Sequence, residues 1–198
     1  MSTPKLENLV LATGNKGKYD EFRALLPRSF VGELLFAPEI GKIDVDENGD
    51  TYEDNALIKA RAWASASGLP SLADDSGIEA EALDGAPGVH SARIVQGTDE
   101  DRNNWLLGQL KDKTDRRGRF VAALALVVPK KWTLICRGEC PGHIAESPSG
   151  SGGFGYDPLF IPDGFDVSFA DLPAEKKNEI SHRAAALNLM LDILAGNK

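Results

Sequence analysis

The sequence has little of what a secreted or membrane-spanning protein requires. Its two cysteines, Cys136 and Cys140, lie in an expected strand whose rise of ~3.3 Å per residue would separate their Cα atoms by about 13 Å, beyond the reach of a disulfide. No apolar run approaches the roughly 20 residues of a transmembrane helix, and the N-terminal run Leu9–Ala12 is too short for a secretion signal. We therefore expect reduced thiols and a cytoplasmic protein with no membrane partner.

A positive net charge is also missing. The 22 lysines and arginines are outnumbered by 30 aspartates and glutamates, which gives a formal net charge of −8. Proteins that coat nucleic acids carry basic surfaces, so we expect no nucleic-acid partner. The charge does not exclude a small polyanion bound with a metal in a locally basic pocket. The 198 residues suffice for one domain, or for two lobes that share a core.

Signatures of covalent catalysis and of zinc binding are absent as well. The three histidines, His90, His143 and His182, have no metal-ligand spacing, and two cysteines without a second Cys/His pair make a poor zinc site. No Ser/His/Asp or Cys/His pattern is present. Any chemistry must therefore come from other side chains.

What the sequence does contain is an acidic pair, Asp74 and Asp75, on a short segment between chain breakers. Adjacent carboxylates repel each other unless a cation, hydrogen bonds or solvent offsets their charge. The pair is a candidate for a divalent ion or a general base, although two surface acids at a turn would give the same pattern. An acidic loop, which could bring a second carboxylate toward Asp75, contains Asp44, Asp46, Glu47 and Asp50.

A glycine-rich loop follows a strand expected at Asn8–Ala12 and precedes a helix that Pro27 ends. The loop consists of Thr13, Gly14, Asn15, Lys16, Gly17 and Lys18. Glycines let backbone N–H groups approach an anion, while the helix N-terminus and the lysines add positive charge. This order predicts a phosphate-binding loop, although its spacing is not that of a Walker A motif. The alternative is a plain strand-to-helix turn with surface lysines.

The remaining elements follow from apolar periodicity and from capping or breaking residues. We expect weak strand and loop at Leu34–Ile43 and an antiparallel hairpin around Pro129. The other expected elements are helices at Asp54–Ser67 and Arg102–Leu110, strands at Phe120–Val128, Trp132–Ile144 and Leu159–Ile161, and a final helix capped by Asp171 that runs to about Ala195.

The Gly/Ser-rich loop Ser147–Pro158 ends in Phe154, Tyr156 and Asp157. An aromatic plane and a carboxylate suit a planar heterocycle, because the ring stacks on it and the carboxylate accepts an edge N–H. The alternative is a tight turn with Phe154 in the core. The last helix begins with a basic segment.

Six segments in this order resemble the Ham1/RdgB family of noncanonical purine nucleoside triphosphate pyrophosphatases, and DDSG and GFGYDP resemble its bacterial branch. They are TGNKGK, ENGDTYEDNALIKARA, LADDSG, GAPGVHSAR, GGFGYDPLF and EKKNEISHRAAAL, and the resemblance runs from about residue 8 to residue 192. His90 departs from the family, which usually has an aromatic residue there.

The resemblance implies an α/β fold, in which a long mixed β-sheet is flanked by helices and two lobes of a single domain, residues 1–198, surround a central substrate cleft. It also implies a homodimer and Mg²⁺-dependent hydrolysis of ITP, dITP and XTP to the monophosphate and pyrophosphate, which removes these nucleotides from the pool.

The resemblance further implies roles for individual residues. Asp75 is the general base and approaches the metal, Glu47 is a second metal ligand, and Ser76 contacts the substrate. The phosphates bind to Thr13–Lys18. The nucleobase pocket consists of Phe154, Gly155, Tyr156, Asp157, Lys177, His182 and Arg183.

Two alternatives remain open. A Maf-like pyrophosphatase would act on modified pyrimidine nucleotides, and the GGFGYDP and SHR segments argue against it. A catalytically silent nucleotide-binding protein would have lost its carboxylates, yet Glu47, Asp74 and Asp75 are all present.

Overall fold

The computed structural model describes residues 5–197, and the chain divides into two compact units. The first unit runs to Asp75 and also takes in Ala122–Gly138 and the chain from Arg183 onward. The second unit contains Ser76–Val121 and Glu139–His182. The chain therefore passes from one unit to the other directly after Asp75 and directly after His182, two of the residues predicted to act on the substrate.

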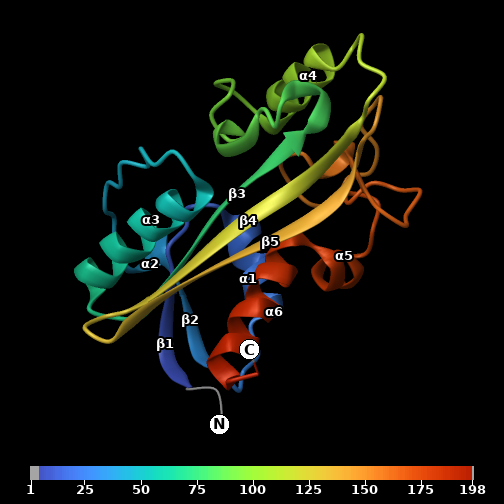
Figure 1. Cartoon of the computed structure of the whole chain (residues 1–198). Helices are drawn as coiled ribbons and strands as arrows, with labels where there is room; N and C mark the ends of the chain where they lie inside the picture. The colour runs from blue at the N-terminus through green and yellow to red at the C-terminus, as the bar shows by residue number, and fades with distance from the viewer. Residues whose placement is uncertain (1–4, 198) are drawn as a thin grey trace. The chain divides into compact units, whose positions relative to one another are not determined.

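Among the described residues, six strands form one mixed sheet in the order β2-β1-β3-β4-β5-β6 (Figure 1). Strand β1 pairs in parallel with β2 and with β3, whereas β5 and β6 are antiparallel. The bounds are β1 Leu6–Leu11, β2 Val31–Phe36, β3 Ser71–Ala80, β4 Arg117–Val128, β5 Trp132–Ile144 and β6 Phe160–Pro162. The predicted α/β class with a mixed sheet is confirmed, while the substrate cleft stays a prediction.

The first four helices lie in the connections between β1 and β4, and the last two follow β6. They are α1 Lys16–Leu25, α2 Ala37–Ile40, α3 Tyr52–Ser67, α4 Asp99–Gln109, α5 Ala174–Ile180 and α6 His182–Ala195, with short 3-10 turns at Glu81–Leu83, Gly88–His90 and Asp157–Leu159. No helix in the range 5–197 is long and apolar enough to cross a membrane.

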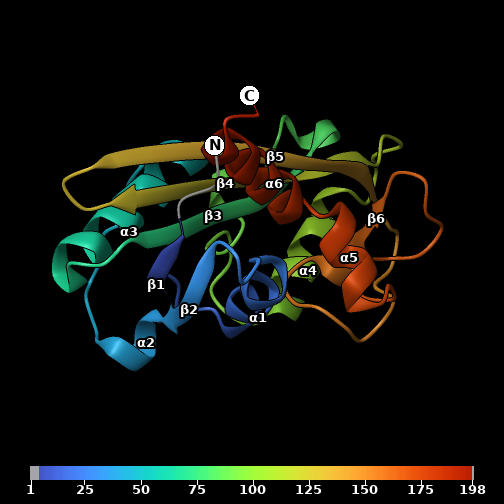
Figure 2. The ribbon, with the colours of Figure 1, turned by 90° about the horizontal axis from the view of Figure 1, so that it is seen from below.

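The core of the first unit explains why its loops are held in place. Strands β1 and β2 lie side by side (Figure 1, Figure 2). Leu9 and Leu11 of β1 pack in one cluster with Phe22 of α1 and Met190 of α6, and Val10 between them is also fully buried. A strand buried on both faces is typical of parallel sheets. Because β1 packs against α1 and α6, the loop that joins β1 to α1 has fixed ends.

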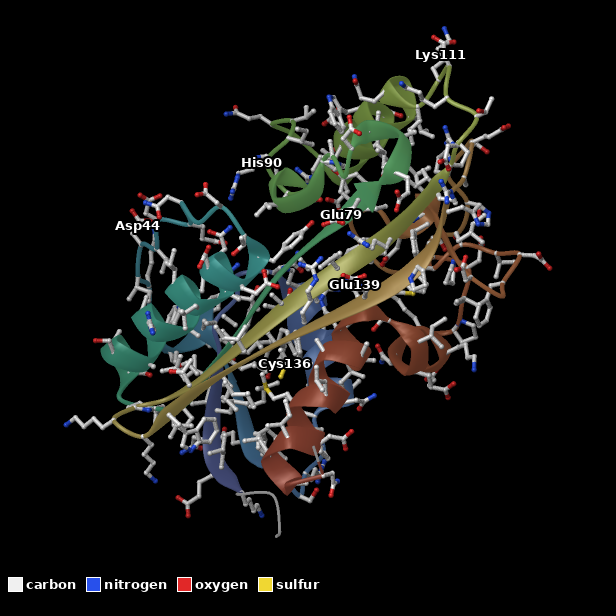
Figure 3. All side chains as sticks on the ribbon, viewed as in Figure 1. Asp44, Glu79, His90, Lys111, Cys136 and Glu139 are labelled. Carbon is white, nitrogen blue, oxygen red and sulfur yellow. The ribbon has the colours of Figure 1, made fainter. Side chains whose placement is uncertain are left out.

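The second unit has its own core of aromatic and aliphatic side chains. Phe120 of β4 lies against Phe160 and Phe169, with ring centroids 4.7 Å and 5.8 Å away. On the same strand, Arg119 binds Glu79 of β3 at 2.7 Å and Glu139 of β5 at 3.5 Å. Both glutamates are labelled in Figure 3. Three adjacent strands of this unit are therefore linked by ion pairs as well as by the backbone.

Most of the predicted elements are confirmed. The first strand, the first helix, the buried strand Phe120–Val128, its hairpin to β5 and the short strand near Ile161 all form, with boundaries shifted by a few residues. Thr98 caps α4 in a complete capping box with Asp101. The two cysteines are buried and free, and Figure 3 labels Cys136.

Two predicted elements are wrong. The segment expected as weak strand and loop at Leu34–Ile43 is the end of a regular strand followed by the short helix α2. The final helix is divided, because Ser181 has an extended backbone (φ −69°, ψ 158°) between α5 and α6. Asp171 does not cap it, since its carboxylate accepts hydrogen bonds from the hydroxyls of Ser149 and Ser168. Serine competes for backbone groups and tolerates such a break.

Candidate active site

The loop between β1 and α1 presents a helix N-terminus to the solvent. Asn15 is the N-cap residue, and its side-chain oxygen accepts the backbone N–H of Lys18 at 3.1 Å. The hydroxyl of Thr13 accepts the N–H of Asn15 at 3.1 Å. The first N–H groups of a helix lack carbonyl partners and carry the positive end of its dipole. A Cβ built on Gly14 would meet no non-neighbouring atom within 4 Å, so the loop has the donors and the space that a phosphate requires.

The two lysines of this loop point in different directions. Lys16 is exposed and pairs with Asp20, which lies one helical turn further along α1. Lys18 turns inward, and its Nζ lies 2.6 Å from Oδ2 of Asp74. Burial lowers the pKa of Lys18, and the attraction of Asp74 offsets part of that effect. Lys18 is therefore the lysine that this loop holds inside the first unit.

Asp74 brings two cations together. Besides Lys18, it binds the guanidinium of Arg183, whose Nε lies 3.4 Å from Oδ2 of Asp74. The Nη1 atom of Arg183 also donates to Oε2 of Glu21 at 2.8 Å. Asp74 and Arg183 are both buried. A charge is tolerated away from water only when it is paired. Asp74 and Glu21 together neutralise Lys18 and Arg183 and fix the orientation of both side chains.

The sheet register explains why Asp74 and Asp75 lie beside the loop. Leu11, the last residue of β1, is opposite Leu72 of β3. Strand β3 continues past that point, so Asp74 and Asp75 extend beyond the end of β1 on the side where the loop begins. Carboxyl ends of parallel strands are where open α/β sheets bind their ligands.

A second pair of carboxylates shares one ammonium group. The Nζ atom of Lys59 lies 2.6 Å from Oε2 of Glu47 and 3.1 Å from Oδ1 of Asp75. Burial alone would lower the pKa of Lys59, but Asp75 and Glu47 outweigh it and raise that pKa. The two predicted metal ligands, which come from the acidic loop and from β3, are thus held at the same point of the first unit.

Asp75 keeps one oxygen available for a ligand. Its Oδ2 atom is buried, and among residues 5–197 it has no hydrogen-bond partner. Burial raises the pKa of Asp75, and the ammonium groups of Lys59 and Lys18 limit the rise. An unsatisfied carboxylate oxygen is costly unless a cation or a water binds it. This oxygen is therefore the most direct indication of a ligand in the first unit.

The donor set fits Mg²⁺ better than it fits a metal enclosed by protein. In the described range, no group of three or more His, Cys, Asp or Glu side chains is placed to hold a metal ion. Mg²⁺ commonly uses one or two carboxylates, keeps several waters and takes its other ligands from substrate phosphates. Glu47 and Asp75, beside the loop predicted to bind phosphate, meet that description.

The acidic loop that carries Glu47 is fastened to α3 by Asn55. The side chain of Asn55 accepts the N–H of Gly49 at 2.9 Å and donates to the carbonyl of Gly49 at 3.2 Å. Asn55 is fully buried, and it lies one helical turn before Lys59. One face of α3 thus supplies both the residue that fixes the loop and the residue that binds its carboxylate.

The predicted base-binding residues of the second unit form a compact cluster. Oδ2 of Asp157 accepts the backbone N–H of Phe154 at 2.8 Å and the ammonium of Lys177 at 2.5 Å. Lys177 also lies over the rings of Phe154 and Phe169, 5.0 Å and 5.6 Å from their centroids. Asp157 therefore fixes the aromatic residue and the cation relative to each other.

The other predicted residues of this unit are positioned as follows. His182 is buried and stacks on Phe120, with ring centroids 4.7 Å apart. Tyr156 donates its hydroxyl to the carbonyl of Ser91 at 2.9 Å. Ser76 is the first residue of the second unit and follows Asp75 on β3. The structure thus groups Phe154, Tyr156, Asp157, Lys177 and His182 in the second unit and places Arg183 in the first.

Sequence reasoning did not assign the residues that hold these groups in place. Five residues bind predicted site residues or the loops that carry them. They are Glu21, Asn55 and Lys59 in the first unit, and Asp99 and Asn103 in the second. One signal for them was available. Asn55 and Lys59, like Asp99 and Asn103, are pairs of polar residues at i and i+4, which share one face of a helix.

These features define an α/β protein in which a glycine-containing loop at a helix N-terminus lies beside a pair of carboxylates. The chain belongs to the Ham1 family, which it matches over residues 9–193. The resemblance seen in the sequence is thereby confirmed. A relative from Symbiobacterium thermophilum, named dITP/XTP pyrophosphatase, is 50% identical over 95% of this chain and 95% of its own. One from Deinococcus radiodurans, with the same name, is 46% identical over 94% of this chain and 92% of its own.

Solved structures agree with this assignment. The Ham1 protein of Staphylococcus aureus is 38% identical and superposes with a TM-score of 0.84, covering 97% of this chain and 100% of that chain. A HAM1 protein from Coxiella burnetii is also 38% identical, with a TM-score of 0.85 and coverage of 96% and 100%. The likeness extends over nearly the whole length of each chain.

Proposed function

We propose that this protein hydrolyses noncanonical purine nucleoside triphosphates, namely dITP, ITP and XTP, to the nucleoside monophosphate and pyrophosphate. The observation that carries the proposal concerns the carboxylate of Asp75, whose buried Oδ2 atom has no partner in the range 5–197 and whose Oδ1 shares Lys59 with Glu47. The names of relatives at 50% and 46% identity support the choice of substrate.

Glu47 and Asp75 are the residues that would hold Mg²⁺. When bound, the ion would offset phosphate charge and lower the pKa of an attacking water. The carboxylates would supply hard oxygen ligands, and the unsatisfied Oδ2 of Asp75 would gain a partner. This assignment rests on the chemistry of the donor set and on the family likeness.

The residues around the loop hold the triphosphate. The N–H groups at the start of α1 and the ammonium of Lys18 offset its negative charge. A water then attacks the α-phosphorus, the bond from that phosphorus to the bridging oxygen breaks, and pyrophosphate leaves. Positioning and charge neutralisation supply most of the rate enhancement in reactions of this kind.

Asp75 accepts the proton of the attacking water. An ordinary aspartate, with a pKa of ~3.9, is a weak base at neutral pH. Burial raises the pKa of Asp75, and a base is more effective when its pKa lies closer to the working pH. Because a bound Mg²⁺ would lower that pKa again, the position of Asp75 beside the attacking water matters more to this proposal than its base strength.

Recognition of the base falls to the residues around Phe154. Its ring would stack on the heterocycle, and Lys177 would donate to the 6-oxo group that distinguishes hypoxanthine and xanthine from adenine. Adenine presents a donor at that position, so a fixed cation there would leave both groups unpaired. Polar mismatches of this type discriminate far more strongly than a missing methylene group.

We further propose that the protein is a cytoplasmic homodimer. The family likeness supports both statements. Sedimentation velocity of the purified protein would test the dimer directly, since a single species of monomer mass would contradict it.

One experiment separates the candidate functions. ITP, dITP, XTP, GTP, ATP, UTP and dTTP are each incubated with the protein and Mg²⁺, and pyrophosphate and orthophosphate are measured separately. Pyrophosphate from the first three nucleotides is the expected result. Preference for UTP or dTTP would favour the Maf-like alternative, and ITP binding without product would favour a silent nucleotide-binding protein.

A further inference from the structure

Both backbone groups of Gly155 are bound by side chains from one helix. The N–H of Gly155 donates to Oδ2 of Asp99 at 2.7 Å, and its carbonyl accepts the side-chain N–H of Asn103 at 3.0 Å. Asp99 and Asn103 are four residues apart on α4, so they share one face of that helix. Gly155 has a φ of +65°, a conformation that glycine adopts without strain. Asp99 and Asn103, which we call the clamp, therefore fix a turn that the backbone alone would leave free to rearrange.

The clamp completes the immobilisation of the segment Phe154–Asp157. Phe154 is held through its N–H by Asp157 at 2.8 Å. Tyr156 is held through its hydroxyl by Ser91 at 2.9 Å. Gly155, which has no side chain to anchor, is held by its main chain alone. Each residue of the segment thus has its own anchor in the second unit.

Asn103 does not stabilise the helix α4 in which it lies. Asparagine is a poor helix former, and this side chain is only 7% exposed. The atom that faces Gly155 must be the donor, because the group opposite is a carbonyl. The other atom, Oδ1, is buried and has no partner within the described part of the chain. A leucine of similar volume would avoid that unsatisfied oxygen, which indicates that the bond to Gly155 is what Asn103 provides.

We propose that Asp99 and Asn103 are positioning residues for base selection. By fixing Gly155, they hold the ring of Phe154 and the carboxylate of Asp157 in one arrangement before the substrate binds. Preorganisation lowers the cost of ordering a binding segment, and it keeps the segment from adapting to the wrong base. This inference rests on the proposed function, because it assumes that Phe154–Asp157 contacts the nucleobase.

The expected effects appear in KM and in selectivity rather than in kcat. Asn103→Asp keeps the shape of the side chain but places a carboxylate oxygen against the carbonyl of Gly155. Losing a preorganising contact worth one to two hydrogen bonds should raise KM for ITP about tenfold. The ratio of kcat/KM for ITP to that for GTP should fall by a similar factor, while kcat for ITP stays within about twofold.

Neighbouring residues supply matched controls. Asn104 is exposed on the same helix, so Asn104→Asp makes the same chemical change without touching Gly155. For the second anchor, Asp99→Ala, which removes the acceptor, is compared with Glu100→Ala, since Glu100 is an exposed acid in the same first turn. Asn103→Leu is a further variant, which removes the bond together with the unsatisfied oxygen. Thermal unfolding of every variant shows whether it is folded.

Amide hydrogen exchange gives a second readout that needs no substrate. The N–H of Gly155 should exchange at least ~10-fold faster in Asp99→Ala and Asn103→Asp than in either control, because its protection depends on the bonds from Asp99 and Asn103. A folded Asn103→Leu should show the same raised KM and lowered selectivity as Asn103→Asp.

The outcomes distinguish this inference from the proposed function. If the wild-type protein releases pyrophosphate from ITP but Asn103→Asp equals Asn104→Asp in KM, selectivity and exchange, the positioning role is overturned and the function stands. If the wild-type protein does not release pyrophosphate from ITP, the proposed function is overturned, and base selection with it. Faster exchange with an unchanged selectivity ratio also overturns the role in base selection.

Discussion

The ammonium of Lys59 lies 3.1 Å from Oδ1 of Asp75 and contacts Glu47 with the same atom at 2.6 Å. Two carboxylates that would otherwise repel each other are joined by one positive charge. Because Lys59 projects from α3, the ion pairs fasten the acidic loop and the strand β3 to one helix. Lys59 thus keeps together the two carboxylates that are proposed to hold a divalent cation.

Replacing Lys59 by methionine should shift the pH dependence of turnover. The ammonium of Lys59 opposes the rise in the pKa of Asp75 that burial causes. Without it, the ionised form of Asp75 is less favoured, so its pKa rises further and the acidic limb of the kcat/KM profile moves to higher pH. Rates with ITP measured from pH 5 to pH 9 test this.

The matched control for that profile is Lys131→Met, which removes an exposed lysine from the turn between β4 and β5 in the same unit. Its acidic limb should coincide with that of the wild type. If Lys59→Met lowers the rate at every pH but leaves the limb in place, Lys59 does not tune Asp75, whatever its other contributions.

Asp75→Asn should abolish turnover without weakening the fold. Loss of the general base alone should lower kcat by ~10²-fold or more. Burial raises the pKa of Asp75 above its value in the unfolded chain, so its ionised form destabilises the folded state. The stabilising contribution of its neutral form is complete below the unfolded pKa and is lost as the pH rises through the folded pKa. At neutral pH the asparagine variant should therefore be at least as stable as the wild type.

Thermal unfolding at pH 7 and at pH 4 checks the sign of this effect. The advantage of Asp75→Asn should be larger at pH 7, where Asp75 is ionised in the wild type, than at pH 4. A variant that melts well below the wild type at pH 7 would show that the bond to Lys59 outweighs the burial of the charge.

The thiol of Cys140 should resist alkylation in the folded protein. Burial raises the pKa of Cys140 to about 12, and the thiolate is the reactive form. At pH 8 the ionised fraction is therefore very small. Iodoacetamide followed by mass spectrometry should modify Cys140 only after denaturant is added. Rapid labelling of native protein at pH 8 would contradict the burial of this residue.

Much of the fold could be predicted because its signals are local. The strand, loop and helix around Thr13–Lys18 follow from apolar periodicity and from glycine and proline, and the buried strand Phe120–Val128 follows from its continuous apolar run. The break at Ser181 could not be predicted in this way, since the residues around it favour helix on both sides. It lies one residue before the point where the chain passes from the second unit to the first, which no local pattern marks.

The site was predicted residue by residue from the family resemblance, but its supporting contacts could not be. Glu21 and Arg183 are 162 residues apart in the chain, and Asp99 and Gly155 are 56 apart. No spacing rule relates residues so distant. The composition of each local segment shows that charges are present, whereas only the folded chain shows which of them neutralise each other.

Asn55 should control the metal requirement without contacting the metal. It binds both backbone groups of Gly49 at 2.9 Å and 3.2 Å, two residues beyond Glu47. Asn55→Ala removes both bonds, so the acidic loop loses its anchor on α3 and Glu47 is no longer held beside Asp75. Loss of a contact that orients a metal ligand typically weakens metal binding by ~10- to 100-fold. The Mg²⁺ concentration for half-maximal activity should rise by such a factor.

The KM for ITP, measured at saturating Mg²⁺, should change much less, because the phosphate-binding loop and Lys18 do not depend on Asn55. Asn48→Ala is the matched control, since Asn48 is exposed in the same loop and its side chain binds Asp46 rather than the backbone of Gly49. An equal rise in the Mg²⁺ requirement in both variants would mean that any change in the loop has this effect. An unchanged Mg²⁺ requirement in a folded Asn55→Ala protein would instead mean that Glu47 is not a metal ligand. A ligand carried by a loosened loop cannot bind as tightly as one that is held in place.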